Sequence, residues 1–245
     1  MNELKTKSLA QIVNENYQAA SVFEKYHLDF CCKGKRSLMQ ACEEGKLSTD
    51  ELVTALQEAV NAEDNLVPVN FSLLPLSHLA DYIVSTHHEF VKKEMPQILA
   101  YLQRVTSKHG SRHPEMAEVF GLFMALKEEM EYHMEKEELI LFPRIKELER
   151  QINAGTDLNF SINYVQAPVQ VMEQEHDHAG GILAKIRELT SQYNPPADAC
   201  TTYRLSFAAL EAFEKDLHQH VHLENNILFP KAIELFKEAT TGSLN

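Results

Sequence analysis

Two stretches of the sequence place a histidine and a glutamate four residues apart in matching surroundings. The segments HMEKEELILFP and HVHLENNILFP begin at His133 and His220, and both follow the pattern His-x3-Glu-x2-Ile-Leu-Phe-Pro. Residues four apart lie on one face of an α-helix, which brings His133 next to Glu137. The same spacing pairs His220 with Glu224. One such pair arises easily by chance, whereas two copies in the same context indicate a metal site.

Both pairs continue an apolar stripe of their helix. A carboxylate in a buried stripe is very costly unless its charge is compensated, and metal coordination is the simplest compensation. The apolar residues that lead into the two pairs at steps of three or four are Val119, Leu122, Leu126 and Met130 in one helix and Leu210, Phe213 and Leu217 in the other.

The duplication predicts one further histidine in each half. His88 and His176 lie 88 residues apart, each on the apolar stripe of its own segment, whereas His87 falls beside the stripe. In antiparallel neighbouring helices, residues at equal height are equidistant from the connecting loop. The midpoints between candidate ligands on successive helices fall inside predicted chain breaks. The residues expected at one level of the protein are therefore His88, His133, Glu137, His176, His220 and Glu224.

Four imidazoles and two carboxylates suit two metal ions, with Glu137 and Glu224 bridging them and two histidines on each ion. Oxygen and imidazole ligands favour iron or manganese, although the ligands alone leave zinc open. Open coordination positions remain for oxygen, peroxide or nitric oxide. The prediction is a pair of iron ions with carboxylate and oxo bridges.

Chain breaks define the elements that must position these residues. Glycine and proline are scarce, with 8 and 9 among 245 residues, and helical periodicity runs through most of the chain. The segments KHGSRHP, NAGTD and NPPAD separate long amphipathic stretches. Pro96 lies inside the first stretch and is expected to kink the helix or open its hydrogen-bond ladder. The four predicted helices span residues 76–107, 114–150, 165–192 and 198–238.

A further break, NAEDNLVPVNFSLLP, marks a domain boundary. Residues 1–62 are expected to form a small helical domain, in which Ser48 begins a helix before LVTALQEAV. Residues 63–75 are the predicted linker and residues 76–245 the predicted bundle. The expected fold class is all-α: an up-down four-helix bundle preceded by a small helical domain.

Composition excludes several classes of partner. The formal net charge of −13 repels nucleic acid phosphate and anionic membrane surfaces. No stretch approaches the roughly eighteen consecutive apolar residues of a membrane span, and the first residues lack the apolar core of a signal peptide. We therefore expect a cytoplasmic protein that binds neither nucleic acid nor membrane. The four cysteines are too few and too scattered for a disulfide scaffold, so reduced thiols are expected.

Two adjacent cysteines, Cys31 and Cys32, are followed by three basic residues within four positions. Nearby cations lower the pKa of a thiol, so both are candidates for redox chemistry, nitrosyl binding or transient iron binding. The alternative is a pair of small buried residues. Cys42 and Cys200 have no such context and are expected in the core.

The sequence resembles the hemerythrin-like di-iron proteins and, among them, the repair-of-iron-centres proteins of the ScdA type. The resemblance covers nearly the whole chain. It rests on HMEKEELILFP, EQEHDHAG and HVHLENNILFP in the bundle, and on LDFCCKGKRSL with its adjacent cysteines near the N-terminus. It places the family's ligand set on the same six residues. The nearby histidines that the pattern does not need are expected at the surface or as support for the ligands: His87, His178, His218 and His222.

The resemblance implies the restoration of iron-sulfur clusters damaged by nitrosative or oxidative stress, by iron donation. The expected partners are damaged iron-sulfur proteins, small ligands such as nitric oxide or oxygen, and a second copy of the chain in a homodimer. A redox enzyme that reduces nitric oxide or peroxide at the same centre is the alternative, with oxygen storage or sensing as a weaker third. The same ligands serve both main functions, so the residues leave the choice open.

Overall fold

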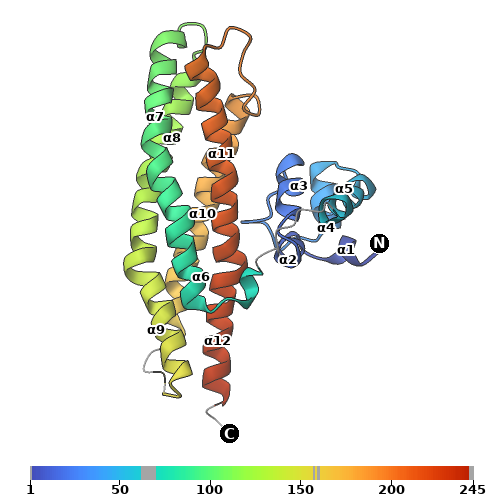
Figure 1. Cartoon of the computed structure of the whole chain (residues 1–245), viewed down its shortest axis with the longest axis vertical. Helices are drawn as coiled ribbons and strands as arrows, with labels where there is room; N and C mark the ends of the chain where they lie inside the picture. The colour runs from blue at the N-terminus through green and yellow to red at the C-terminus, as the bar shows by residue number, and fades with distance from the viewer. Residues whose placement is uncertain (1, 62–69, 157, 159–160, 243–245) are drawn as a thin grey trace.

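The described chain is all-α, which confirms the expected fold class. The computed structural model describes residues 2–61, 70–156, 158 and 161–242. Within these ranges there is no β-strand, only an isolated bridge between Ser8 and Ser37. A small N-terminal group of helices lies beside a long bundle (Figure 1). Among the described helices, none is both long and apolar enough to cross a lipid bilayer.

The small domain begins its helices with local capping residues. The hydroxyl oxygens of Ser8 and Ser37 each accept a hydrogen bond from the backbone N–H of the residue three positions on. That residue is a glutamine in both cases, and its side-chain oxygen accepts the backbone N–H of the serine. The predicted start at Ser48 is confirmed, since its hydroxyl oxygen accepts the N–H of Glu51 at 3.4 Å. The helices are α1 (Asn2–Thr6), α2 (Leu9–Glu15), α3 (Ala19–Lys25), α4 (Leu38–Gly45) and α5 (Thr49–Asn61).

Four long rods form the second part, with their turns at the three predicted breaks. In the first rod, helix α7 packs against α8 of the second rod and α11 of the fourth. Helix α8 also packs against α10, the third rod (Figure 1). The first rod is α6 (Leu76–Ile83), η2 (Val84–His88) and α7 (Glu89–His109). The second is α8 (Glu115–Lys136), η3 (Glu137–Leu141) and α9 (Phe142–Asn153). The third is α10 (Asn163–Leu189), and the fourth is α11 (Thr201–Leu223), η4 (Glu224–Leu228) and α12 (Phe229–Gly242).

Three rods contain a π-helical turn that the sequence pattern did not predict. In η3 the N–H of Phe142 donates to the carbonyl oxygen of Glu137, five residues back, and in η4 Phe229 bonds in the same way to Glu224. Each phenylalanine is followed by a proline, which has no N–H and whose ring would collide with the carbonyl four residues earlier. The widened turn relieves this collision. Both glutamates of the predicted metal site therefore open a π turn.

Part of the predicted linker and all of the first bundle helix lie within the described residues. Residues 63–69 of the linker lie outside the described residues, and its last part is ordered as the short 3₁₀ turn η1 (Phe71–Leu73). Phe71 is buried in the bundle core. Helix α7 continues through Pro96, and the widened turn of this rod lies earlier, in η2.

The core of the bundle consists of two apolar clusters, one on each side of a polar level. One cluster includes Val91, Phe123 and Leu210, and the other includes Leu141 and Phe229. The buried histidines and glutamates lie between them in the sequence of each rod. A separate apolar core fills the small domain. The polar level is therefore enclosed by close-packed side chains above and below.

Candidate metal centre

The polar level brings together all of the predicted metal ligands, each at most 2% exposed. The Nε2 atoms of His88 and His220 lie 3.1 Å apart, and those of His133 and His176 lie 3.0 Å apart. Each histidine pair forms a constellation with both glutamates, in which the ligand atoms lie within 4.8 Å of one another. The two constellations are His88, Glu137, His220 and Glu224, and His133, Glu137, His176 and Glu224.

Each glutamate reaches both histidine pairs. Glu137 Oε2 lies 3.4 Å from Nε2 of His88 and 3.3 Å from Nε2 of His133. Glu224 places Oε1 3.0 Å from Nε2 of His220 and Oε2 3.1 Å from Nε2 of His176. A carboxylate between two sets of imidazoles has the position of a bridging ligand.

The hydrogen bonding of the two glutamates tests whether these residues suit bound cations. Both carboxylate oxygens of Glu137 and the Oε2 atom of Glu224 are fully buried; imidazole nitrogens lie 3.1–3.4 Å from the two Oε2 atoms, but none of the three oxygens has a hydrogen-bond partner of good geometry among the described residues. Buried carboxylate oxygens without donors are costly, and a bound cation satisfies them. The imidazole and carboxylate ligands suit iron, manganese or zinc.

The buried histidines and glutamates of the centre shift one another's pKa values. Burial disfavours the charged form of His88, but Glu137 and Glu224 outweigh it and raise its pKa to about 10. His133 follows the same pattern, also with a pKa of about 10. Burial dominates instead at His220, whose pKa is lowered. Despite burial, the surrounding histidines hold the pKa of Glu224 well below its usual range, so this side chain stays an anionic ligand.

Outer side chains fix three of the four imidazoles. The Nδ1 atoms of His88, His133 and His176 lie 2.7, 2.9 and 2.9 Å from oxygens of other side chains. Such contacts hold Nδ1–H outward and turn Nε2 toward the metal position. The sequence reasoning missed these partners, although Glu138 directly follows Glu137 in one copy of the repeat and Asn225 directly follows Glu224 in the other. The partners, in the same order, are Glu138, Glu175 and Asn225.

Comparison with known proteins agrees with this geometry. Residues 79–232 match the family model described as the hemerythrin HHE cation binding domain. This chain belongs to the hemerythrin family. Residues 5–60 match the ScdA_N domain, a domain of unknown function, so the family domain is preceded by the module that carries the adjacent cysteines.

Relatives with both parts cover almost the whole chain. The iron-sulfur cluster repair protein ScdA of Staphylococcus haemolyticus is 34% identical over 223 residues, which are 91% of this chain and 96% of the relative. The iron-sulfur cluster repair protein YtfE of Yersinia pseudotuberculosis is 32% identical, over 94% of this chain and 98% of the relative. The YtfE protein of Musicola paradisiaca is 34% identical, over 93% and 96%. The resemblance to ScdA-type proteins is thus confirmed.

The hemerythrin-type centre of this chain is not symmetric. Glu175, directly before His176, anchors the Nδ1 atom of His133, whereas the repeat places His87 directly before His88. The His87 ring stacks on His220 at 5.7 Å between centroids and 7° between planes. The Nδ1 atom of His220 has no hydrogen-bond partner among the described residues. One half of the centre is therefore anchored at both histidines and the other at only one.

The extra histidines occupy several environments. His178 is exposed beside Glu129, as expected. His87 is only 2% exposed and its Nδ1 atom lies 3.0 Å from Asp216. His218 and His222 face the small domain, where they contact Glu24 at 2.7 Å and Asn14 at 2.9 Å. His218 and His222 thus form part of the domain contact, and His87 packs behind the candidate ligand His220.

The cysteines lie outside the six-residue centre, and all four are free thiols. The expectation that neighbouring cations lower the thiol pKa is wrong for Cys31, because a hydrogen bond with Cys32, burial and the Asp29 carboxylate raise it. Cys42 is buried as expected. Cys200 was expected in the core but is exposed, because it precedes α11 in the turn at the end of the bundle.

Proposed function

We propose that this protein holds two iron ions at the bundle centre and restores damaged iron-sulfur clusters by donating iron. The observation that carries the proposal is the pair of buried constellations that share Glu137 and Glu224. The repair role is supported by relatives named iron-sulfur cluster repair proteins, which match this chain over both domains. Proteins with clusters damaged by nitrosative or oxidative stress are the proposed clients.

The residues of the chain supply binding, orientation and access. Glu138, Glu175 and Asn225 hold three imidazoles with Nε2 facing inward, while Glu137 and Glu224 offer oxygens to both metal positions. Bound iron supplies exchangeable metal and one-electron redox chemistry at its open coordination positions. The packed apolar clusters on both sides limit the entry of water along the bundle axis.

Two surface cavities reach ligand side chains, as metal release requires. A cleft of about 570 Å³ between the small domain and the bundle is lined in part by His176. A groove of about 380 Å³ between α8 and α10 is lined in part by His133 and Glu175. Iron, or a small ligand such as nitric oxide, thus has a short route between solvent and the centre.

Iron transfer to an acceptor tests the proposal. Purified protein should contain about two irons per chain, and these should pass to a protein whose iron-sulfur cluster has been damaged with nitric oxide, restoring its absorption spectrum. Stoichiometric zinc without iron after iron-replete expression would contradict the proposed centre. Multiple-turnover consumption of nitric oxide or peroxide with a supplied reductant, and no loss of iron, would favour a redox enzyme instead.

A further inference from the structure

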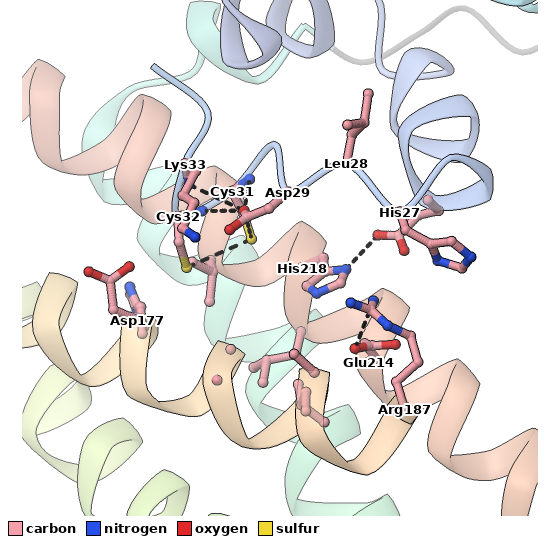
Figure 2. A pocket seen from close by; sticks show the side chains of 18 residues that line it. His27, Leu28, Asp29, Cys31, Cys32, Lys33, Asp177, Arg187, Glu214 and His218 are labelled. Carbon is pink, nitrogen blue, oxygen red and sulfur yellow. Dashed lines mark hydrogen bonds and ion pairs between the residues drawn. The ribbon is translucent and has the colours of Figure 1, made fainter. Parts of the chain in front are cut away.

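The loop between α3 and α4 gathers a carboxylate and two thiols outside the bundle centre. Asp29 Oδ1 accepts backbone N–H bonds from Cys31 at 3.1 Å, Cys32 at 2.9 Å and Lys33 at 3.2 Å. These bonds fold the loop tightly around one carboxylate (Figure 2). The Asp29 Oδ2 atom makes no hydrogen bond within the described part of the chain, so one carboxylate oxygen remains for another ligand.

The spacing of the ligand atoms suits a single metal ion. The Sγ atoms of Cys31 and Cys32 lie 3.9 Å apart, and Cys31 Sγ lies 3.3 Å from Asp29 Oδ1. Two thiolates on one tetrahedral ion, each about 2.3 Å from the metal, are separated by about 3.8 Å. One ligand atom from each residue falls within 4.8 Å of the others. An ion therefore fits between these atoms with little rearrangement of the loop.

Residues of the bundle also hold the loop between α3 and α4 in place. The side-chain amide of Asn226 donates to the carbonyl oxygen of Cys31 at 2.9 Å. Cys31 is only 3% exposed and packs into the bundle core, while Cys32 is partly exposed. A Cβ atom at Gly180 of α10 would lie 3.9 Å from Cys32 Sγ, so this glycine leaves the thiol close to the helix surface without a side chain between them. The pair is thus fixed in place before any ligand arrives.

We propose that Asp29, Cys31 and Cys32 form a mononuclear site for a divalent transition-metal ion, separate from the six-residue centre. Thiolate ligands select ions such as ferrous iron and zinc over magnesium and calcium. Each thiol releases its proton as its sulfur binds the ion, and no electrons are transferred. Three protein ligands leave a fourth position open toward the cleft, as in metal sites that exchange ligands and unlike closed structural sites.

The position of the site suggests what it does. Cys31, Cys32 and Asp29 line the same cleft of about 570 Å³ as the bundle ligand His176 and its neighbour Asp177. In Figure 2 Asp177 lies on the side of the cleft facing Cys32. An ion that leaves the centre along this cleft meets the two thiols before it reaches an acceptor. This transfer role rests on the proposed function, whereas the existence of the site does not.

Cobalt(II) is the probe for the site, added under anaerobic conditions to full-length protein that already carries its iron. We expect one additional cobalt ion per chain and a near-ultraviolet thiolate-to-cobalt charge-transfer band, with the iron content unchanged. The Asp29→Asn variant keeps an oxygen for the three N–H groups but lacks the negative ligand, so its cobalt dissociation constant should rise by at least about tenfold. Cys32→Ser leaves one thiolate, so it should weaken cobalt binding and reduce the band by at least about half.

Cys200→Ser, at the far end of the bundle, is the matched control and should bind cobalt like the parent protein. A band that persists in Cys31→Ser/Cys32→Ser, or that is absent from the folded parent, would overturn the site. Circular dichroism shows whether each variant is folded, and the single variant at the partly exposed Cys32 tests the site if the double variant is not. The proposed function fails separately, by lack of iron transfer from parent protein to the damaged acceptor while cobalt still binds.

Discussion

The side-chain nitrogen of Asn226 donates to the carbonyl oxygen of Cys31 at 2.9 Å and thereby joins the metal centre to the cysteine loop. Asn226 lies two residues after Glu224, inside the π turn η4. The turn that presents Glu224 to both histidine pairs therefore also holds the loop of the other domain. A displacement of η4 would therefore act on the backbone of the loop that carries the two thiols.

Asn226→Ala should loosen the cysteine loop without removing iron, because the Asn226 side chain hydrogen-bonds to the loop and to His222 but to none of the six candidate ligands. Hydrogen exchange of residues 26–37 should become faster, while iron per chain stays at the parent value. Asn153→Ala, at an exposed helix end, is the control and should change neither quantity. Unchanged exchange in the loop would show that other contacts fix it.

Glu224→Leu distinguishes a bridging carboxylate from one that is merely buried. If Glu224 serves both metal positions, its loss leaves two cations close together with less negative charge between them, and iron should be lost or become labile. A buried acid without a metal would instead cost stability, and leucine would raise the thermal midpoint. Iron per chain and thermal midpoint are measured together. Glu234→Leu, on the exposed face of α12, should retain all iron.

Iron should leave the two halves of the centre at different rates. His133 and His176 are both anchored through Nδ1, whereas Nδ1 of His220 has no partner within the described residues. Loss of such an anchor typically weakens metal binding by about 10- to 100-fold. A chelator should therefore remove iron in two phases of comparable amplitude. Glu175→Ala removes the anchor of His133 and should bring the two rates together, whereas a single phase in the parent protein would refute the asymmetry.

Glu149 provides a pH-dependent contribution to stability at the start of α6. Its two carboxylate oxygens accept the N–H groups of Leu76 at 2.6 Å and Ser77 at 3.0 Å. Burial opposes the charged form, but hydrogen bonding with the Ser77 side chain, together with these two backbone bonds, outweighs it and lowers the pKa of Glu149 below 4.5. The stabilisation is therefore complete above about pH 4.5 and is lost as the pH falls through the lowered value.

Glu149→Gln should lower the free energy of unfolding by roughly 0.5–1 kcal/mol at neutral pH, a value reduced for the partial exposure of this side chain. Denaturant unfolding at neutral and acidic pH measures the difference between variant and parent. The difference should shrink as the pH falls below about 4.5 and through the lowered pKa of Glu149. Glu234→Gln controls for the loss of one surface charge, and an equal effect at both pH values would exclude the capping role.

The sequence by itself was sufficient to predict the helices and the level of the candidate ligands. Helical periodicity fixes which residues of one rod share a face, and the chain breaks fix the height of each rod relative to the next. Together they predict that His88 and His176 meet the two Glu-containing pairs, His133–Glu137 and His220–Glu224. These relationships depend only on spacing along the chain, because neighbouring antiparallel helices start from a common turn.

The tertiary structure decided which side chains surround those ligands. Glu175 reaches His133 across two helices, and Asn226 reaches Cys31 across two domains, so both contacts depend on helix rotation and domain placement. The same holds for the Cys31 thiol. Two of its basic neighbours in sequence pair with other carboxylates, Arg36 with Glu44 and Lys35 with Glu173, while a carboxylate and a second thiol face the sulfur. Spacing along the chain carries no information about such contacts, because each is set by how separate elements pack.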